Sequence, residues 1–99
     1  TNLVNIPQGK TPEQVKAWTA KQAYLALGFG LIATAAEEVD ACPMEGFNAE
    51  LMDEILGLPE KNLHTAVIMT LGYRDTTNDW LVNLPKVRRD TPDLFTVIE

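Results

Sequence analysis

The stretch "AYLALGFGLIATAA" (residues 23–36) is apolar over its whole length except for Thr34. Upstream, "TPEQ" (residues 11–14) is a helix-start signal, with threonine as N-cap, proline at the first helical position and glutamine three residues after the cap. No proline follows until Pro43, so we expect one helix from about Pro12 to about Val39. Because residues 23–36 are apolar on every face of that helix, we expect them to be buried all round.

This helix has more apolar surface to shield from water than the remaining residues of the chain can easily bury. Each large side chain left in water forfeits about 1.5–3 kcal/mol. The stretch is too short to cross a bilayer, which takes about 20 residues. We therefore expect a partner surface, either another subunit or the rest of a longer protein. Gly28 and Gly30 each cost the helix about 1 kcal/mol. They indicate close approach by another helix, a cofactor ring or a backbone, or they are simply tolerated.

The rest of the chain mixes helix and strand signals. Residues 39–42 form a short extended piece, and Asn48 caps a second helix over about Ala49–Leu56 that Gly57 closes. "TAVIMTLGY" (residues 65–73) is β-branched and apolar, which predicts a central strand covered on both faces. "LFTVIE" (residues 94–99) resembles a strand without a local partner, so it favours pairing with a distant sheet edge, including that of another subunit.

Composition excludes several classes of function. With 45% hydrophobic and 22% charged residues, the 99-residue chain fits one small globular domain or a piece of a larger one. A net charge of −6 argues against nucleic-acid binding. The single cysteine, Cys42, excludes an intrachain disulfide and suits the cytoplasm. Cys42 and His64 are too few for a structural zinc site. The first residues show no signal peptide and no initiating methionine, so we expect the back part of a longer protein, or a processed chain.

The loop "PMEGF" (residues 43–47) is the first candidate site. It lies between the end of a strand and the start of a helix, where ligands gather in open α/β sheets. Its backbone N–H groups and the helix N-terminus suit an electron-rich acceptor, and Gly46 would allow a flat ring to approach. The alternative is an ordinary strand-to-helix turn in which Glu45 is solvated.

The basic segment "KVRR" (residues 86–89) is the second candidate. In an extended chain Lys86 and Arg88 point to one side and Arg89 to the other. Two cations on one side suit a phosphate, although a solvated basic loop is equally compatible with the pattern. The residues provide no Ser/His/Asp or Cys/His set, so in an enzyme the difficult chemistry would belong to a cofactor.

Three motifs occur together and in order: "AKQAYLALG" (residues 20–28), "PMEGF" and "PKVR" (residues 85–88). In this combination the chain resembles the C-terminal half of FMN-dependent NAD(P)H nitroreductases, closest to the oxygen-insensitive nitroreductase and dihydropteridine reductase group. The resemblance covers residues 18–89. The family's Arg-rich N-terminal segment has no counterpart here. We therefore expect residues 1–99 to be the C-terminal part of one nitroreductase-like domain.

The resemblance implies an α+β fold in which a long central helix packs on a mixed sheet within an intertwined homodimer. It implies FMN as cofactor and NAD(P)H as co-substrate, with nitroaromatic, quinone or pteridine acceptors. The positions that match the family's flavin contacts are Pro43, Met44, Glu45, Gly46, Lys86 and Arg88. The backbone N–H groups of Glu45 and Gly46 would face the flavin edge, and no side chain would be catalytic. The alternative is a dimerisation or regulatory module that kept the helix and lost the flavin. Neither a metal, a nucleic acid nor a membrane is expected as a partner.

Overall fold

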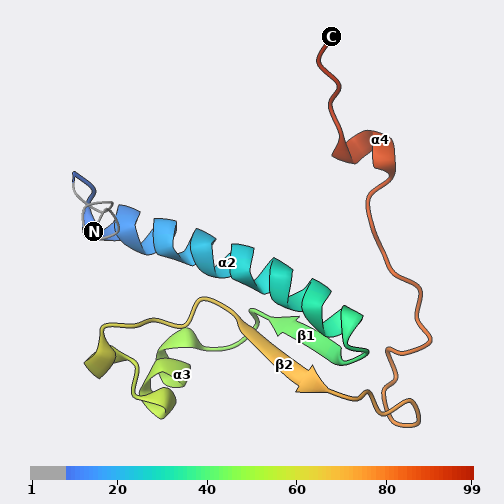
Figure 1. Cartoon of the computed structure of the whole chain (residues 1–99), viewed down its shortest axis with the longest axis horizontal. Helices are drawn as coiled ribbons and strands as arrows, with labels where there is room; N and C mark the ends of the chain where they lie inside the picture. The colour runs from blue at the N-terminus through green and yellow to red at the C-terminus, as the bar shows by residue number, and fades with distance from the viewer. Residues whose placement is uncertain (1–8) are drawn as a thin grey trace.

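The computed structural model describes residues 9–99, and its elements follow one another in the order helix, strand, helix, strand, helix (Figure 1). These elements are α2 (Pro12–Ala36), β1 (Asp40–Met44), α3 (Ala49–Leu56), a single 3-10 turn (Pro59–Lys61), β2 (Ile68–Gly72) and the short α4 (Thr91–Leu94). Helices and an antiparallel strand pair therefore occur together, which confirms the α+β class.

Helix α2 begins as the sequence predicts and ends three residues earlier. The Thr11 hydroxyl accepts a hydrogen bond from the Gln14 N–H at 3.1 Å, and the Gln14 side chain accepts one from the Thr11 N–H at 2.9 Å. This reciprocal pair satisfies two of the backbone donors that a helix start leaves free. The expected continuation to Val39 is wrong, because Glu38 adopts the left-handed region at φ 59° and turns the chain back toward β1.

Strands β1 and β2 form an antiparallel pair in which Asp40 lies opposite Gly72 and Met44 opposite Ile68. The strand predicted over residues 65–73 is present but shorter, over Ile68–Gly72. Its predicted central position is not found within residues 9–99, where β1 is its single neighbour. A mixed sheet, as predicted, would also need parallel strand pairs, and the strands of the described residues form none.

One face of α2 lies along the strand pair (Figure 1). Its half-buried positions in this region recur at helical spacing and are Leu27, Gly30, Leu31 and Thr34. A Cβ added to Gly30 would lie 3.1 Å from the Cε of Met69, so the group that approaches this glycine is a side chain of β2 rather than the helix, cofactor ring or backbone that the sequence indicated. An added Cβ at Gly28 would meet nothing within 4 Å.

The opposite face of α2 is open. Leu25, Phe29 and Ile32 are 61%, 74% and 71% exposed, and no hydrophobic side chain described by the structure is buried. The radius of gyration is 17.9 Å, whereas a compact domain of this length has a value of about 13 Å. The all-round burial expected for residues 23–36 is therefore not found within residues 9–99, which are too few to cover both faces of the helix.

The C-terminal third carries little regular structure. Of the segment predicted as a strand, Leu94 ends helix α4, and residues 95–99 pair with no strand among the described residues, so pairing with another subunit stays a prediction. Pro92, in the first turn of α4 after the N-cap Asp90, is a helix-start signal that precedes the apolar run. Figure 1 shows the terminus leading away from α2 and the strand pair.

Candidate functional site

The predicted loop at residues 43–47 begins two residues late in the structure. Pro43 and Met44 belong to β1, where Pro43 lies opposite Met69, and a proline is tolerated because this strand lies at a sheet edge. The turn itself therefore comprises Glu45, Gly46 and Phe47. The N–H of Phe47 donates to the Glu45 carbonyl at 2.9 Å. Next along the chain, the side chain of Asn48 accepts from the Leu51 N–H at 3.0 Å and caps α3 as predicted.

Two neighbouring backbone donors in this turn have no acceptor within residues 9–99: the N–H groups of Glu45 and Gly46. The space beside Gly46 is also open, since a Cβ built there would meet nothing within 4 Å. Both residues are exposed, so water satisfies these donors in the free protein, and an acceptor atom of a ligand could take the place of that water. The two donors and the open approach fit the electron-rich edge of a flat ring such as a flavin.

The side chain of Glu45 has its own partner on helix α2. A polar interaction with the Glu45 carboxylate raises the pKa of the Tyr24 hydroxyl, with desolvation acting in the same direction. Tyr24 lies in the apolar stretch of α2, so this interaction joins the turn to the long helix.

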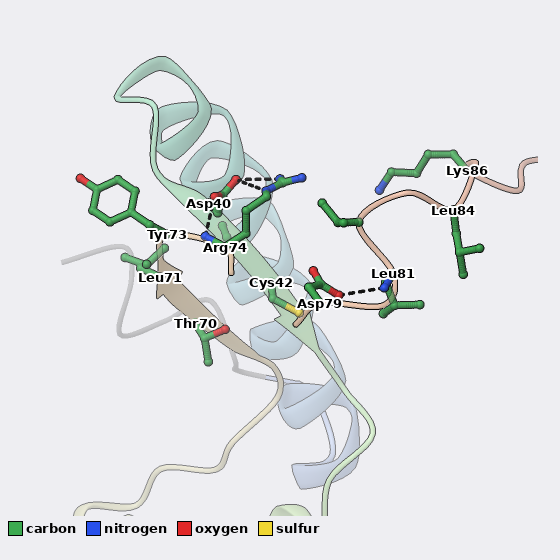
Figure 2. Close-up of a pocket in the computed structure, with 13 residues that line it drawn as sticks. Asp40, Cys42, Thr70, Leu71, Tyr73, Arg74, Asp79, Leu81, Leu84 and Lys86 are labelled. Carbon is green, nitrogen blue, oxygen red and sulfur yellow. Dashed lines mark hydrogen bonds and ion pairs between the residues drawn. The ribbon is translucent and has the colours of Figure 1, made fainter. Parts of the chain in front are cut away.

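The basic segment is not extended as a regular strand, and its two predicted phosphate ligands have different surroundings. Lys86 lines an open hollow of about 440 Å³ at the Asp40 end of the strand pair (Figure 2). Arg88 does not line this hollow, and its Nη1 donates to the Val87 carbonyl at 2.8 Å. None of residues 43–46 lines the hollow either. The described structure therefore does not bring the two halves of the predicted site into one cavity.

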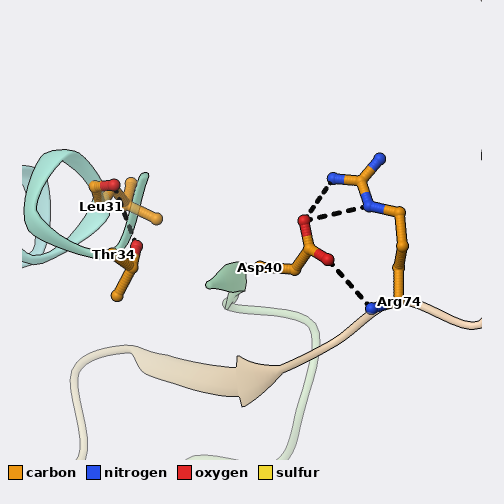
Figure 3. Close-up of polar contacts among 4 residues, drawn as sticks. All are labelled: Leu31, Thr34, Asp40 and Arg74. Atoms are coloured by element: carbon orange, nitrogen blue, oxygen red, sulfur yellow. Dashed lines mark hydrogen bonds and ion pairs between the residues drawn. The ribbon is translucent and has the colours of Figure 1, made fainter. Parts of the chain in front are cut away.

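An ion pair that sequence reasoning missed lies at this same Asp40 end of the strand pair. The Asp40 carboxylate accepts from Nη2 of Arg74 at 2.7 Å, from its Nε at 3.0 Å and from its backbone N–H at 2.9 Å (Figure 3). These hydrogen bonds lower the pKa of Asp40 and raise that of Arg74. The guanidinium is thus engaged by a carboxylate rather than presented to a phosphate. Arg74 follows the predicted strand directly, but its partner lies 34 residues away, where no local pattern reveals it.

A second cluster that sequence reasoning missed surrounds Asp53 of α3. Asp53 is 7% exposed and is the one residue buried in the described part of the chain. Its Oδ1 accepts from the backbone N–H of Thr65 at 2.7 Å and from the Thr65 hydroxyl at 2.5 Å. The side chain of His64 is 57% exposed, and its Nδ1 lies 3.5 Å from the Asp53 Oδ2. The bonds from Thr65 hold the pKa of Asp53 below its ordinary value.

Metal ligands and membrane spans are not found among residues 9–99. No three His, Cys, Asp or Glu side chains of this range gather as metal ligands would. None of the helices in the same range is long and apolar enough to cross a bilayer.

Comparison with known proteins shows to which family the chain belongs. Residues 3–73 match the model of the Nitroreductase family. The chain is 39% identical over 83 residues to the major NAD(P)H-flavin oxidoreductase of Aliivibrio fischeri, which covers 84% of this chain and 38% of that protein.

Two relatives named oxygen-insensitive NAD(P)H nitroreductase are similar to a comparable degree. The Salmonella typhimurium protein is 42% identical over 71 residues, 72% of this chain and 32% of the relative. The Enterobacter cloacae protein is 41% identical over 79 residues, 80% of this chain and 36% of the relative. The chain thus spans well under half the length of these relatives, and it belongs to the nitroreductase family.

Proposed function

We propose that residues 1–99 are the C-terminal part of a nitroreductase-like domain in a cytoplasmic, FMN-dependent NAD(P)H oxidoreductase. The observation that carries this proposal is the pair of N–H groups at Glu45 and Gly46, which have no acceptor within residues 9–99 and lie next to open space. They fall in the loop that the resemblance matches to the family's flavin contacts. The relatives' names, which mention NAD(P)H, a flavin and nitro compounds, support the class of reaction.

FMN, when bound, would supply the redox chemistry by accepting hydride from NAD(P)H at N5 and passing it to a nitroaromatic, quinone or pteridine acceptor. The chain would contribute orientation and charge. The N–H groups of Glu45 and Gly46 would donate to the electron-rich edge of the ring and stabilise negative charge there. Pro43 and Met44, held in β1, would line the same loop. Lys86 and Arg88 would neutralise the flavin phosphate.

The proposed protein is a homodimer. Half of α2 packs on the strand pair and the other half is an uncovered apolar face that contains Leu25, Phe29 and Ile32. An interface of an obligate dimer is about 2,000 Å² or larger and resembles a domain core cut in half, which is the character of this face. The remainder of the longer protein would cover the outer surface of the strand pair.

The roles of Glu45 and Gly46 can be separated by substitution in the full-length protein. Glu45→Gln keeps the backbone donors, so FMN affinity and most of the activity should remain. Gly46→Val adds a branched side chain where the ring would lie, so FMN binding should be lost. FMN is titrated into each apo-protein and followed by flavin fluorescence, and turnover of a nitroaromatic is measured with NADH and NADPH.

The opposite pattern would overturn this assignment. Loss of turnover in Glu45→Gln together with a silent Gly46→Val would make the Glu45 side chain the functional group. A full-length protein that dimerises and remains colourless with excess FMN would instead favour the non-catalytic dimerisation module, since the apolar face of α2 needs a partner whether or not a flavin is bound.

A further inference from the structure

Asp53 combines burial, charge and distant partners in a way that no other residue of the described chain does. It is the single buried residue among residues 9–99. Its carboxylate accepts hydrogen bonds from both the backbone N–H and the hydroxyl of Thr65. Hydrogen bonds to an ionised acceptor are stronger than neutral ones. The contact spans 12 residues and joins α3 to the segment that leads into β2.

Helix α3 has little else to hold it in place within residues 9–99. Its large apolar side chains are mostly in water, with Leu51, Ile55 and Leu56 at 56%, 78% and 55% exposure. Apolar packing ordinarily positions a helix in a protein, whereas intrinsic propensity contributes little over eight residues. The position of α3 therefore depends on a polar contact, and that contact is made by Asp53.

The chain connectivity extends this constraint on α3 to the turn that holds the N–H groups of Glu45 and Gly46. Met44 is held opposite Ile68 at one end of the strand pair, and Asn48 begins α3 only four residues later. Between them lie Glu45 and Gly46. When Asp53 fixes α3 to Thr65, and Thr65 leads within three residues into β2, both ends of the turn are attached to the same strand.

We propose that Asp53 is a positioning residue that holds the Glu45 and Gly46 N–H groups in place through α3. The identity of the ligand that these two N–H groups would bind rests on the function proposed above. Asp53 does not touch the ligand in this proposal. Its effect is to keep the turn preorganised, so that binding does not have to order it.

The test uses the full-length protein and compares Asp53→Ala with Glu54→Ala. Glu54 is an exposed carboxylate on the same helix, so its removal controls for charge and for helix propensity. Hydrogen exchange in the apo-protein is followed at the Phe47 and Leu51 amides, which donate within the turn and its cap. Asp53→Ala should speed exchange at these amides relative to amides of α2, and it should weaken FMN binding at least roughly tenfold. Glu54→Ala should change neither.

Thr65 provides a second route should Asp53→Ala fold poorly. Thr65→Val keeps the shape and the backbone N–H but loses the hydroxyl donor, so it should show a smaller effect in the same direction. Thr65→Ser restores the hydroxyl and should restore both exchange and affinity. A merely structural role would lower the unfolding temperature and speed exchange uniformly, without rescue in the flavin titration.

Each result decides a separate point. The positioning role is overturned if Asp53→Ala leaves exchange unchanged at the Phe47 and Leu51 amides. It is also overturned if exchange rises equally across α2. Faster local exchange in Asp53→Ala supports it. If the wild-type protein binds no FMN while Asp53→Ala still loosens the turn, the proposed function falls and the positioning role of Asp53 stands.

Discussion

Helix α2 and the C-terminal segment both expose apolar side chains, yet one is fully regular and the other is not. On α2, Phe29 and Ile32 are 74% and 71% exposed, and the helix continues without interruption from Pro12 to Ala36. In the C-terminal segment, Val97 and Ile98 are 82% and 91% exposed, and residues 95–99 form no element.

The difference shows where each kind of structure finds its hydrogen bonds. An α-helix pairs its N–H groups with carbonyls four residues earlier, so α2 is complete without a neighbour. A strand pairs its backbone with another strand, so an apolar β-branched segment without one has no regular structure to adopt. Both segments still need cover for their side chains, and under the proposed function the second subunit would supply it.

The largest expected effect comes from placing a charge on the open face of α2. Phe29→Glu should give insoluble protein or block dimerisation, because burying an unpaired carboxylate costs far more than the 1.5–3 kcal/mol or so that a large apolar side chain gains. The measurements are the soluble fraction and the molar mass by light scattering. Lys16→Glu, on the exposed part of the first turns, is the control and should stay soluble. A soluble Phe29→Glu protein that dimerises like the wild type would mean that this face is open in the whole protein.

A smaller effect is expected in the basic segment and tests whether the C-terminal third becomes extended in the complete protein. Arg88→Ala removes a charge-assisted phosphate contact worth about 1.5–3 kcal/mol, or roughly ten- to a hundredfold in FMN affinity. Arg89→Ala should retain FMN, because an exposed cation contributes at most about 1 kcal/mol. Flavin fluorescence titration of each apo-variant separates the two. Equal losses would contradict the alternating arrangement of Lys86, Arg88 and Arg89.

The smallest effect is expected at the C-terminus. If residues 94–99 pair with the other subunit, Ile98→Asp should lower the free energy of unfolding by about 1.5 kcal/mol, the low end for a large apolar side chain, since chain ends fray. Thermal unfolding of the full-length protein at fixed concentration measures this. Thr96→Asp is the matched control on the same face of a strand, where a polar side chain loses little. An unchanged unfolding temperature in Ile98→Asp would leave the segment unpaired in the dimer as well.

Much of the secondary structure could be predicted because its signals are local. The Thr11 and Gln14 capping box, the Asn48 cap and the left-handed Gly57 at the end of α3 all lie where the pattern indicated. The predictions failed where a longer-range or competing signal decides. Glu38 ends α2 early, Pro92 starts a helical turn before the apolar C-terminal run, and β2 is shorter than its apolar sequence.

The candidate site divides in the same way. By itself the sequence determined the loop with Glu45 and Gly46, the basic segment with Lys86 and Arg88, and the resemblance to the family, because each is a contiguous motif. Only the tertiary structure showed that the Asp53 carboxylate accepts a hydrogen bond from Thr65 and that the Asp40 carboxylate accepts one from Arg74. The partners in these contacts are 12 and 34 residues apart, and such pairs depend on how the strands and α3 are placed in space, which no local pattern specifies.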